Sequence, residues 1–299
     1  MGKIAYVTTE IKKTMLRAWV VLRYPDKTVR KQMRKNLIVN AEKKYLRRYM
    51  NVLQNEQQKE ITENSPKIIW ICWLQGEENM PPIVKKCLQS VRKFCPEYKI
   101  IILTDKNIPE FIAFPEYIAK RRQAGEMTNT HFSDILRVSL LAEYGGIWID
   151  ATVLLTAQLM PEITQTKFFA YHTHSYVKNQ SWLLQAEAGN LLMKNMQNLL
   201  FAYWKKEHKL IDYFLYHIFF DMMVEHNAEC AAMWANVPLI YDDCYELEAN
   251  YFVPYDEKKW KKIREQTSVH KLSWKYKKEP QKGDFVDALL NGKLEDFGQ

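Results

Sequence analysis

The hydrophobic positions of the first 50 residues follow the spacing of an α-helix. An amphipathic helix repeats its apolar side chains every three to four residues. The positions that do so here are Val29, Met33, Leu37, Ala41 and Tyr45, with Ile38 and Leu46 widening the stripe. An earlier apolar stretch covers residues 11–22, and Pro25 separates the two stretches because proline rarely continues a helix. The pattern predicts an N-terminal arm of two helices.

After residue 66 the pattern changes to short apolar runs that alternate with helical stretches. The runs at 67–73, 98–103 and 147–149 predict buried strands, and residues 83–94 predict a helix between the first two. Strand, helix and strand at this spacing form a βαβ unit, which implies a parallel sheet. Ligands of such sheets bind at the carboxyl ends of the strands, where Trp73, Asp105 and Asp150 fall. We therefore expect an α/β fold in which helices flank a mostly parallel sheet.

Charge separates the arm from the rest of the chain. Residues 1–60 hold 15 Lys and Arg and 5 Asp and Glu, whereas the remainder holds 28 basic and 30 acidic residues. A basic amphipathic helix can lie on an anionic membrane, bind nucleic acid, or pack on the body as a solvated helix. No nucleic-acid-binding motif accompanies the charge, so a membrane surface and a structural role stay open. The predicted division is a basic arm over 1–62, with a polar linker at 55–64, and one domain over 63–299.

Cysteine usage and hydropathy bear on the compartment. The five cysteines form no C-x-x-C pair, so neither a disulfide framework nor a zinc knuckle is indicated. Lysines and arginines interrupt the apolar residues at the N-terminus, unlike the layout of a signal peptide. The longest apolar stretch, 213–224, is shorter than the roughly 20 residues of a membrane span. We expect a cytoplasmic protein, peripheral on the inner face of the cell membrane if the arm binds lipid.

The most informative stretch is residues 131–152, which read HFSDILRVSLLAEYGGIWIDAT. Ser133 or Asp134 is expected to cap a helix, because short polar side chains accept bonds from the first free N–H groups. Asp134 and Arg137 are three residues apart and share one helix face. The pair by itself is also compatible with an ordinary surface ion pair.

The second half of this stretch predicts a turn and an acidic strand end. Gly145 and Gly146 permit the left-handed backbone that ends a helix, and a short buried strand then brings Asp150 to its exit. The glycines by themselves fit a plain helix stop, and Asp150 by itself fits a cap of the next turn. Together with the Asp–Arg helix, these residues fit a site for a diphosphate and a metal at a strand end.

The sequence S-D-x-x-R followed by Y-G-G-I-W-I-D-A-T resembles the capsular polysaccharide synthesis proteins, which are related to glycosyltransferase family 32. The similarity is good over residues 66–153 and loose elsewhere. It implies a GT-A (Rossmann-like) fold and a retaining hexosyltransferase. Such an enzyme would move a hexose, with galactose as the first candidate, from a UDP-sugar to a glycan acceptor in capsular or surface polysaccharide synthesis. Lipid-linked glycans are among the acceptors that this implies.

The resemblance also implies roles for individual residues. Trp73 stands where the family's tryptophan stacks on uracil, and the late H-K-L-x-x-K element matches His270, Lys271 and Lys275. The residues expected at the donor are Trp73, Asp105, Ser133, Asp134, Arg137, Asp150, Lys271 and Lys275. Of these, Asp134, Arg137 and Asp150 are the expected catalytic residues.

The resemblance implies a divalent metal, but one ligand of its D-x-D motif is replaced. The motif reads Asp150-Ala151-Thr152, and a neutral threonine oxygen is a poorer ligand for Mg²⁺ or Mn²⁺ than a carboxylate. His270 is expected to complete the metal shell with Asp150, which would favour Mn²⁺. Because the motif is incomplete, a non-catalytic nucleotide- or glycan-binding protein stays open, as does a membrane-surface scaffold.

The acceptor side is marked more weakly in the sequence. The residues expected near the acceptor are Asn179, Ser181, Asp212 and His217.

Overall fold

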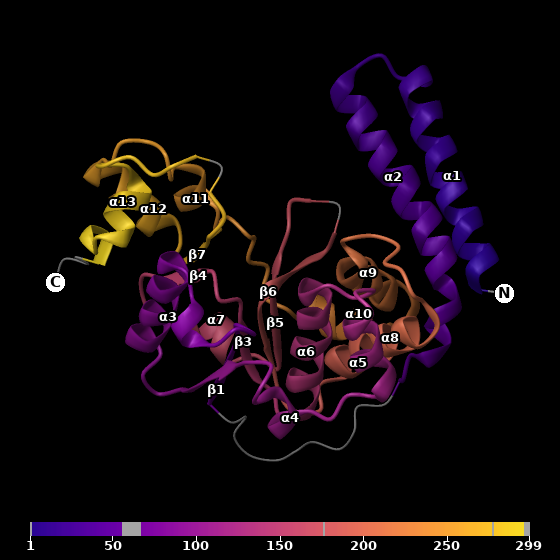
Figure 1. The fold of residues 1–299 in the computed structure, drawn as a ribbon, viewed down its shortest axis with the longest axis horizontal. Coiled ribbons are helices and arrows are strands. Elements are labelled where there is room, and N and C mark those ends of the chain that lie inside the picture. The colour runs from indigo at the N-terminus through magenta and orange to yellow at the C-terminus, as the bar shows by residue number, and fades with distance from the viewer. Residues whose placement is uncertain (1, 56–66, 176, 277, 296–299) are drawn as a thin grey trace. The chain divides into compact units, whose positions relative to one another are not determined.

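The computed structural model describes residues 2–55, 67–175, 177–276 and 278–295. They form two compact units, each assembled from separate pieces of the chain (Figure 1). The helical unit comprises Met1–Gln58, Phe114–Ser139 and Leu191–Asn236, and the sheet unit comprises Lys59–Ala113, Leu140–Asn190 and Val237–Gln299. Most of the predicted linker at 55–64, and the predicted domain start at residue 63, lie outside the described residues. The division of the chain at residues 62 and 63 stays a prediction.

The sheet unit is built on a five-stranded sheet with the order β2-β1-β3-β6-β5. Its strands are β1 (Ile68–Cys72), β2 (Lys99–Leu103), β3 (Gly146–Ile149), β5 (Phe168–His172) and β6 (Asn179–Ala186). Strand β1 pairs in parallel with β2 and β3, while β6 is antiparallel to β3 and β5. Four of the five strands therefore run in one direction. The expected α/β fold with a mostly parallel sheet and flanking helices is confirmed.

The first βαβ unit forms where the hydrophobic pattern predicts it. Helix α3 (Pro82–Phe94) connects β1 to β2, and its proline occupies the first turn, where no backbone N–H is needed. The short helix α4 (Ile108–Phe111) follows β2. The indole of Trp70 on β1 is buried and donates to the carbonyl of Gly145 at 2.9 Å, which ties the centre of the sheet to the turn before β3.

Gly145 and Gly146 have positive φ angles of 67° and 95°. A Cβ on Gly145 would lie 2.5 Å from the backbone nitrogen of Ala188, and one on Gly146 would lie 2.6 Å from the carbonyl oxygen of Ile68. Both sites are therefore closed to any side chain for steric as well as conformational reasons. The predicted glycine turn into β3 is confirmed.

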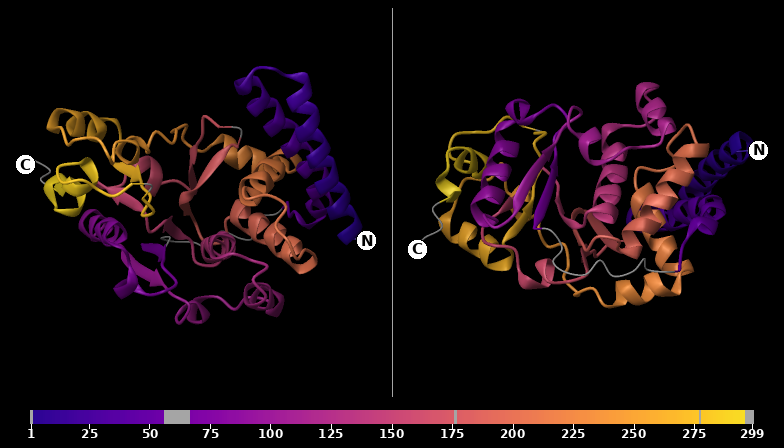
Figure 2. Two further views of the ribbon diagram at one scale, coloured as in Figure 1. Left: turned by 45° about the horizontal axis from the view of Figure 1, so that its top comes forward. Right: turned by 90° about the horizontal axis from the view of Figure 1, so that it is seen from below.

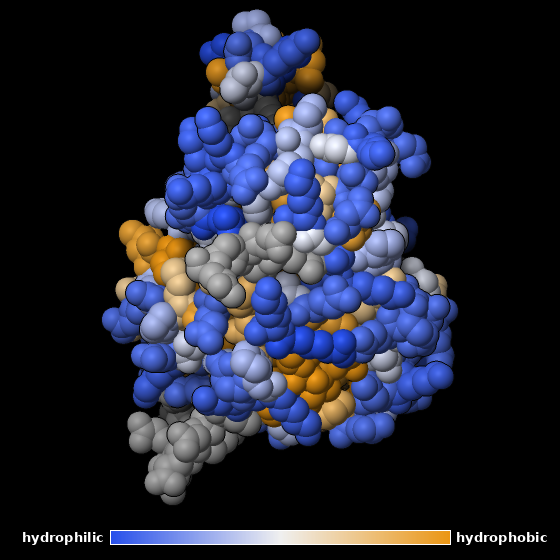
Figure 3. Space-filling view, turned by 90° about the vertical axis from the view of Figure 1, so that its left-hand side faces the viewer, coloured by the Kyte–Doolittle hydropathy of each residue, from blue (hydrophilic) through white to orange (hydrophobic). Residues whose placement is uncertain are grey.

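A second hydrophobic cluster supports the C-terminal part of the sheet unit. It takes residues from α3, β4 (Val153–Leu155), α11 (Glu246–Ala249), α12 (Glu257–Gln266), α13 (Phe285–Leu290) and the 3-10 helix η3 (Lys293–Glu295). The same unit also contains α7 (Pro161–Thr164), β7 (Val269–Lys271) and the 3-10 helix η2 (Glu77–Asn79). Strand β4 pairs with β7, and Trp260 and Phe285 bury their rings in the cluster. On the face that includes α12 and α13, hydrophilic side chains surround exposed hydrophobic areas (Figure 3). A cavity lined by Phe94, Leu154 and Leu289 holds about 50 Å³, too little for a nucleotide.

The helical unit contains seven α-helices among its described residues. They are α1 (Gly2–Arg23), α2 (Lys27–Leu46), α5 (Glu116–Gln123), α6 (Asn129–Glu143), α8 (Leu191–Lys206), α9 (Leu215–His226) and α10 (Ala228–Ala235), and the 3-10 helix η1 (Arg47–Val52) continues α2. The two helices of the arm that the sequence predicts are α1 and α2, and Figures 1 and 2 show them side by side. Asp26 in the turn between them caps α2 by accepting from the N–H groups of Thr28 and Val29.

The arm is packed into the helical unit through its second helix. The apolar stripe of α2 becomes buried toward its C-terminus at Ile38, Ala41 and Tyr45. The Tyr49 ring that follows lies 5.7 Å from the ring of Tyr203 on α8 and is fully buried. The C-terminal half of the hydrophobic stripe that the sequence displays therefore forms protein core, while Val29 at its start is exposed. Among the described residues, no helix has both the length and the apolar character needed to cross a bilayer.

A buried ion pair also joins the two arm helices. Lys13 on α1 lies 2.6 Å from Glu42 on α2, and both side chains are almost fully buried. Lys13 also donates to the carbonyl of Ile211 at 2.8 Å. Burial is the main reason that the pKa of Glu42 is raised to about 7. The neighbouring carboxyl of Asp212 raises it further, while Lys13 acts in the opposite direction. Asp212, expected near the acceptor, is therefore engaged with the arm.

Candidate functional site

Three predicted residues follow neighbouring parallel strands of the sheet unit. Trp73 comes directly after β1, Asp105 two residues after β2, and Asp150 directly after β3. The backbone of Trp73 donates to Leu103 at 2.9 Å, and that of Asp105 donates to Leu74 at 3.2 Å. The sheet order places the three strand ends at one edge, as the sequence predicts. Asp105 is exposed there, whereas Trp73 and Asp150 are half-buried.

Asp150 is held by its own strand and by β6. Its backbone N–H donates to the carbonyl of Trp182 at 2.8 Å, and its carbonyl accepts from Val153 at 2.9 Å, which closes a tight turn. The buried indole of Trp148 donates to Oδ1 at 2.9 Å. The tryptophan in the I-W-I-D run thus orients the carboxylate that follows it, a role that the sequence analysis missed.

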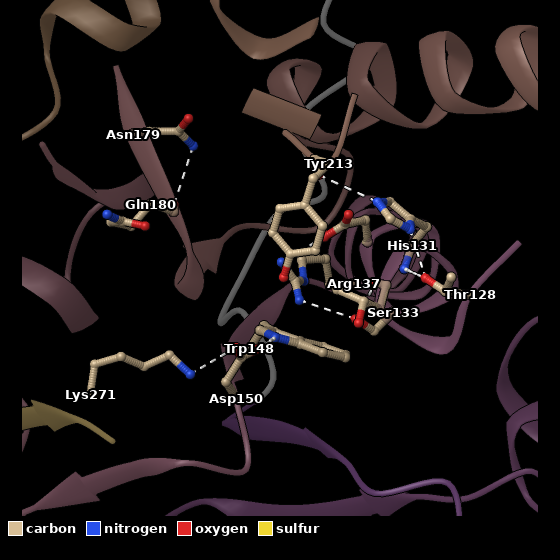
Figure 4. A network of polar contacts seen from close by, with 12 residues as sticks. Thr128, His131, Ser133, Arg137, Trp148, Asp150, Asn179, Gln180, Tyr213 and Lys271 are labelled. Carbon is tan, nitrogen blue, oxygen red and sulfur yellow. Dashed lines mark hydrogen bonds and ion pairs between the residues drawn. The ribbon is translucent and has the colours of Figure 1, made fainter. Parts of the chain in front are cut away.

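Lys271 lies beside this carboxylate, although the two residues are far apart in the chain. Strand β7 pairs Lys271 with Val153, so its side chain reaches the turn after β3. Its Nζ lies 3.3 Å from Oδ2 of Asp150 (Figure 4). The same Nζ donates to the hydroxyl of Thr152 at 2.5 Å. The side chains of Asp150 and Lys271 keep 27% and 18% of their surface exposed. A cation thus stands next to the first and third positions of the D-x-D element.

Trp73 shares its part of the sheet unit with a second tryptophan. The ring of Trp274 lies 5.8 Å from that of Trp73 at an angle of 77°, and the ammonium of Lys275 lies 5.2 Å from the Trp274 ring centre. Trp274 is 39% exposed, and the buried Nε1 of Trp73 has no hydrogen-bond partner among the described residues. Two edge-on rings and a cation suit a planar heterocycle attached to a phosphate. Trp274 was not among the site residues predicted from the sequence.

His270 is not brought together with Asp150. Successive residues of a strand point to opposite sides, and on β7 His270 points away from Lys271, into the protein. It is fully buried, lies 5.7 Å from the ring of Trp260, and has Thr156 at 3.3 Å from Nε2. Burial, with a smaller contribution from Arg264, lowers the pKa of His270 to about 4. The imidazole is therefore neutral at neutral pH.

The donor set around Asp150 does not fit a divalent ion held by protein ligands. Among the described residues, no three His, Cys, Asp or Glu side chains lie close enough together to bind a metal. The Asp150 carboxylate is bonded to Trp148 and paired with Lys271, and Thr152 accepts from the same ammonium. The Lys271 ammonium lies beside both the Asp150 carboxylate and the Thr152 hydroxyl, and this fixed cation repels a metal cation that approaches the same oxygens. The Mn²⁺ or Mg²⁺ that the resemblance implies stays a prediction that this geometry does not favour.

Asp134 and Arg137 form a buried ion pair on α6, in the helical unit. Their Oδ1 and Nη1 atoms are 2.9 Å apart, and the side chains are only 11% and 5% exposed. Ser133 accepts from Nη2 of Arg137 at 3.3 Å, and the ring of Tyr216 lies 6.0 Å from the guanidinium. The interpretation as an ordinary surface pair is therefore wrong. A buried pair costs desolvation free energy and often contributes little to stability.

Helix α6 begins earlier than the sequence predicts, so Ser133 and Asp134 do not cap it. The helix starts at Asn129, and the hydroxyl of Thr128 accepts from the backbone of His131 at 3.4 Å, as an N-cap does. The Nδ1 of His131 lies 2.7 Å from this hydroxyl, and Nε2 lies 3.4 Å from the carbonyl of Tyr213 (Figure 4). His131 therefore connects the start of α6 to the segment before α9, a role that the sequence analysis missed.

The residues expected near the acceptor are not all brought together. Asn179 and Ser181 lie on β6 in the sheet unit, where Asn179 is fully buried and its Oδ1 has no partner among the described residues. Asp212 and His217 lie in the helical unit, Asp212 before α9 and His217 in its first turn. The division between the units falls within α6, after Ser139. The Asp134–Arg137 pair therefore belongs to the helical unit and Asp150 to the sheet unit.

The sequence matches the family described as capsular polysaccharide synthesis protein over residues 19–289. Three curated proteins are similar over shorter segments. The O-glycosyltransferase braB of Annulohypoxylon truncatum is 33% identical over 96 residues, which cover 29% of this chain and 23% of that protein. The O-glycosyltransferase PaGT of Phomopsis amygdali is 29% identical over 106 residues, 32% of this chain and 26% of that protein. The glycosyltransferase afumC of Aspergillus fumigatus is 27% identical over 110 residues, covering 34% and 28%.

The chain thus spans about a quarter of the length of the curated relatives that it matches. Among solved structures, one that is similar is titled PaToxG Glycosyltransferase. It is 15% identical, with a TM-score of 0.43, and the alignment covers 76% of this chain and 84% of that one.

Proposed function

The chain belongs to the capsular polysaccharide synthesis protein family, and on that premise we propose that it is a glycosyltransferase. The similarity to three proteins named as glycosyltransferases supports transfer of a sugar in general. Within that class we propose a UDP-hexose donor, with galactose as the first candidate, and a glycan acceptor in capsular or surface polysaccharide synthesis. The proposed reaction retains the configuration of the sugar and gives an α-linkage.

The observation that carries this proposal is the cluster of Asp150, Thr152 and Lys271 after strand β3. A nucleoside-diphosphate sugar presents two phosphates, and Lys271 offers an ammonium that is fixed by bonds to Asp150 and Thr152 and keeps part of its surface exposed. In the same unit, Trp73 and Trp274 offer two rings for the base, with Lys275 beside them. These groups match the base and the diphosphate of one donor.

In the proposed reaction the bond between the anomeric carbon and the diphosphate oxygen breaks, and the electron pair leaves with UDP. The oxygen of an acceptor hydroxyl forms the new bond to that carbon, from the side that UDP leaves, and releases its proton. Negative charge grows on the departing diphosphate during this step. Cations already in position stabilise that charge without having to reorganise, and we assign this role to Lys271, with Lys275 as its helper.

We propose that the carboxylate of Asp150 positions Lys271 and contacts the donor. The Asp134–Arg137 pair is proposed to contact hydroxyls of the donor sugar, as the resemblance implies. Its burial is compatible with this role, because a buried ion pair is costly to desolvate and is weak evidence for a purely stabilising function. Asn179 and Ser181 stay the proposed acceptor-side residues of the sheet unit. A lipid-linked acceptor would place the protein at the inner face of the cell membrane.

The proposal is tested by incubating the purified chain with a panel of UDP- and GDP-sugars and measuring release of the nucleotide. We expect slow release of UDP from one UDP-hexose and at least about tenfold slower release after Lys271→Met. Lys261→Met is the control, because Lys261 is exposed and lies on α12. Binding of UDP without turnover of any donor would favour a non-catalytic nucleotide-binding protein. No binding of any nucleotide would overturn the proposal.

A further inference from the structure

Helix α1 carries a row of exposed apolar side chains along its outer face from Val7 to Leu22. Val7, Ile11, Met15, Trp19 and Leu22 follow one another at intervals of four and three residues, and so lie on one side of the helix. Their exposed fractions are 53%, 56%, 67%, 47% and 87%. Isolated exposed apolar residues are common, but a continuous row of them marks an interaction surface.

The opposite side of α1 is already occupied by the protein. Lys13 and Val20 are buried there, and Tyr6 donates to the carbonyl of Leu210 at 3.3 Å. The apolar stripe of α2 is likewise buried within the helical unit at Ile38 and Ala41. Most of the exposed apolar surface of the arm therefore belongs to α1; of the stripe that the sequence displays on α2, Val29 at its start is 45% exposed.

The charges near this row are positive. Lys12 and Arg23 are exposed on the flank of the row that carries Trp19, and residues 2–55 hold 14 Lys and Arg against three acidic residues. All three acidic side chains are engaged elsewhere. Glu10 pairs with Lys13 at 3.0 Å, Asp26 caps α2, and Glu42 is buried against Lys13. The row thus offers apolar and cationic groups and no free carboxylate.

This combination identifies the occupant. A second copy of the chain would bring Lys12 and Arg23 against the same cations, with no carboxylate available on either arm. An anionic lipid surface supplies both an apolar layer for the row and phosphates for the cations, and helices with apolar and Lys- or Arg-rich sides lie in the plane of such surfaces. Trp19, at the edge of the row, has the side chain that prefers the boundary between lipid and water.

We propose that the outer face of α1, formed by Val7, Ile11, Met15, Trp19 and Leu22, docks on an anionic membrane, with the helix lying parallel to it. At 22 residues the helix is about 33 Å long, so the whole row meets the surface at once. This inference goes beyond the proposed glycosyl transfer, because it concerns where the protein is held and does not involve the donor site.

The test uses co-sedimentation of the full chain with phosphatidylcholine vesicles, prepared with and without phosphatidylglycerol. We expect binding only when phosphatidylglycerol is present, and at least about tenfold weaker binding for Met15→Glu and for Leu22→Glu, because each adds a charge to the apolar row. Leu239→Glu is the matched control, since Leu239 is 69% exposed in the sheet unit. Lys12→Gln is expected to weaken binding by a smaller factor and to reduce its salt sensitivity.

All these sites are exposed, so the variants should unfold at the temperature of the wild type. UDP release, measured in parallel, should be unchanged, which separates this inference from the proposed function. Equal binding of wild type, Met15→Glu and Leu22→Glu would overturn the inference. So would no vesicle binding together with a dimer, seen by sedimentation velocity, that Leu22→Glu dissociates.

Discussion

The indole nitrogen of Trp148 donates to Oδ1 of Asp150 at 2.9 Å, from a ring that is buried in the sheet. The other oxygen of the same carboxylate faces the ammonium of Lys271 at 3.3 Å. Asp150 is therefore held between a fixed neutral donor on its own strand and a charged donor on β7. The two donors can be removed separately, and they have different expected effects.

Trp148→Phe removes the neutral donor and keeps most of the buried ring. We expect UDP release to fall by about tenfold, because a carboxylate held by one donor in place of two samples more orientations. The free energy of unfolding should fall by only about 1–2 kcal/mol, from one lost hydrogen bond and a small loss of volume. Steady-state kinetics with thermal unfolding checks both values. Trp182→Phe is the comparison, because it loses a hydrogen bond to Tyr245 and leaves Asp150 its bond from Trp148. An equal loss of activity in the two variants would contradict the role of Trp148 in orienting Asp150.

Lys271 is expected to make nucleotide binding independent of a metal. UDP affinity of the wild type, measured by calorimetry, should be the same in EDTA and in Mn²⁺ within about twofold, whereas Lys271→Met should weaken it by about tenfold or more. The double variant Lys271→Ala/Thr152→Asp should bind UDP only with Mn²⁺, because it removes the cation and adds a second carboxylate. If wild-type affinity is lost in EDTA and restored by Mn²⁺, the metal implied by the family resemblance is present and Lys271 does not replace it.

Trp73→Ala should weaken UDP binding by about tenfold, because stacking of a base on an aromatic ring contributes about 1–3 kcal/mol. Trp274→Ala should weaken it by a similar or smaller factor, since Trp274 stands edge-on to Trp73 and is more exposed. Affinity for inorganic diphosphate, which has no base, should not change in either variant. A loss of diphosphate affinity would show that the substitutions act by disturbing Lys271 or Lys275, and not by removing a ring that stacks on the base.

Glu42 should make the stability of the arm depend on pH. Its pKa is raised from 4.5 to about 7 by burial and by Asp212, against the effect of Lys13. The folded state therefore keeps a proton that the unfolded state loses, so this contribution is complete below about pH 4.5 and is lost as the pH rises to about 7. Glu42→Gln should flatten the decrease in unfolding temperature between these pH values. A wild-type unfolding temperature that rises over this interval, and rises equally in Glu42→Gln, would contradict the assignment.

The parts of the fold and site that depend on local pattern could be predicted from the sequence. Strands β1, β2 and β3, helix α3 and the turn at Gly145 follow from short-range hydrophobic spacing and from the conformational freedom of glycine, and the positions of Trp73 and Asp150 follow from them. The start of α6 could not be predicted in this way, because Thr128 caps the helix five residues before the S-D-x-x-R motif that begins at Ser133. A cap depends on a single backbone geometry, which several polar residues in a row can each provide.

The contacts that depend on the pairing register of β7 with β4 could not be predicted from the sequence. Lys271 meets Asp150 only because β7 pairs with β4 so that Lys271 is opposite Val153. A shift of one residue would have turned His270 toward Asp150 and buried Lys271. A three-residue strand among several lysines gives no alternation pattern from which to choose between them. For the same reason the family resemblance identified His270 and Lys271 as residues of interest, but only the structure shows which of the two side chains points toward Asp150.

Tyr49 closes the helical unit from the arm side, with its ring 5.7 Å from Tyr203 and 6.1 Å from Phe219. The unit is thus assembled from three distant pieces of the chain, and the first of them is the arm itself. No single cut can release the unit intact, and a chain shortened at residue 60 would leave α8 and α9 with a hydrophobic face open to water. Limited proteolysis should therefore destroy the helical unit rather than trim it, and the arm is better studied by point substitution on its outer surface than by deletion.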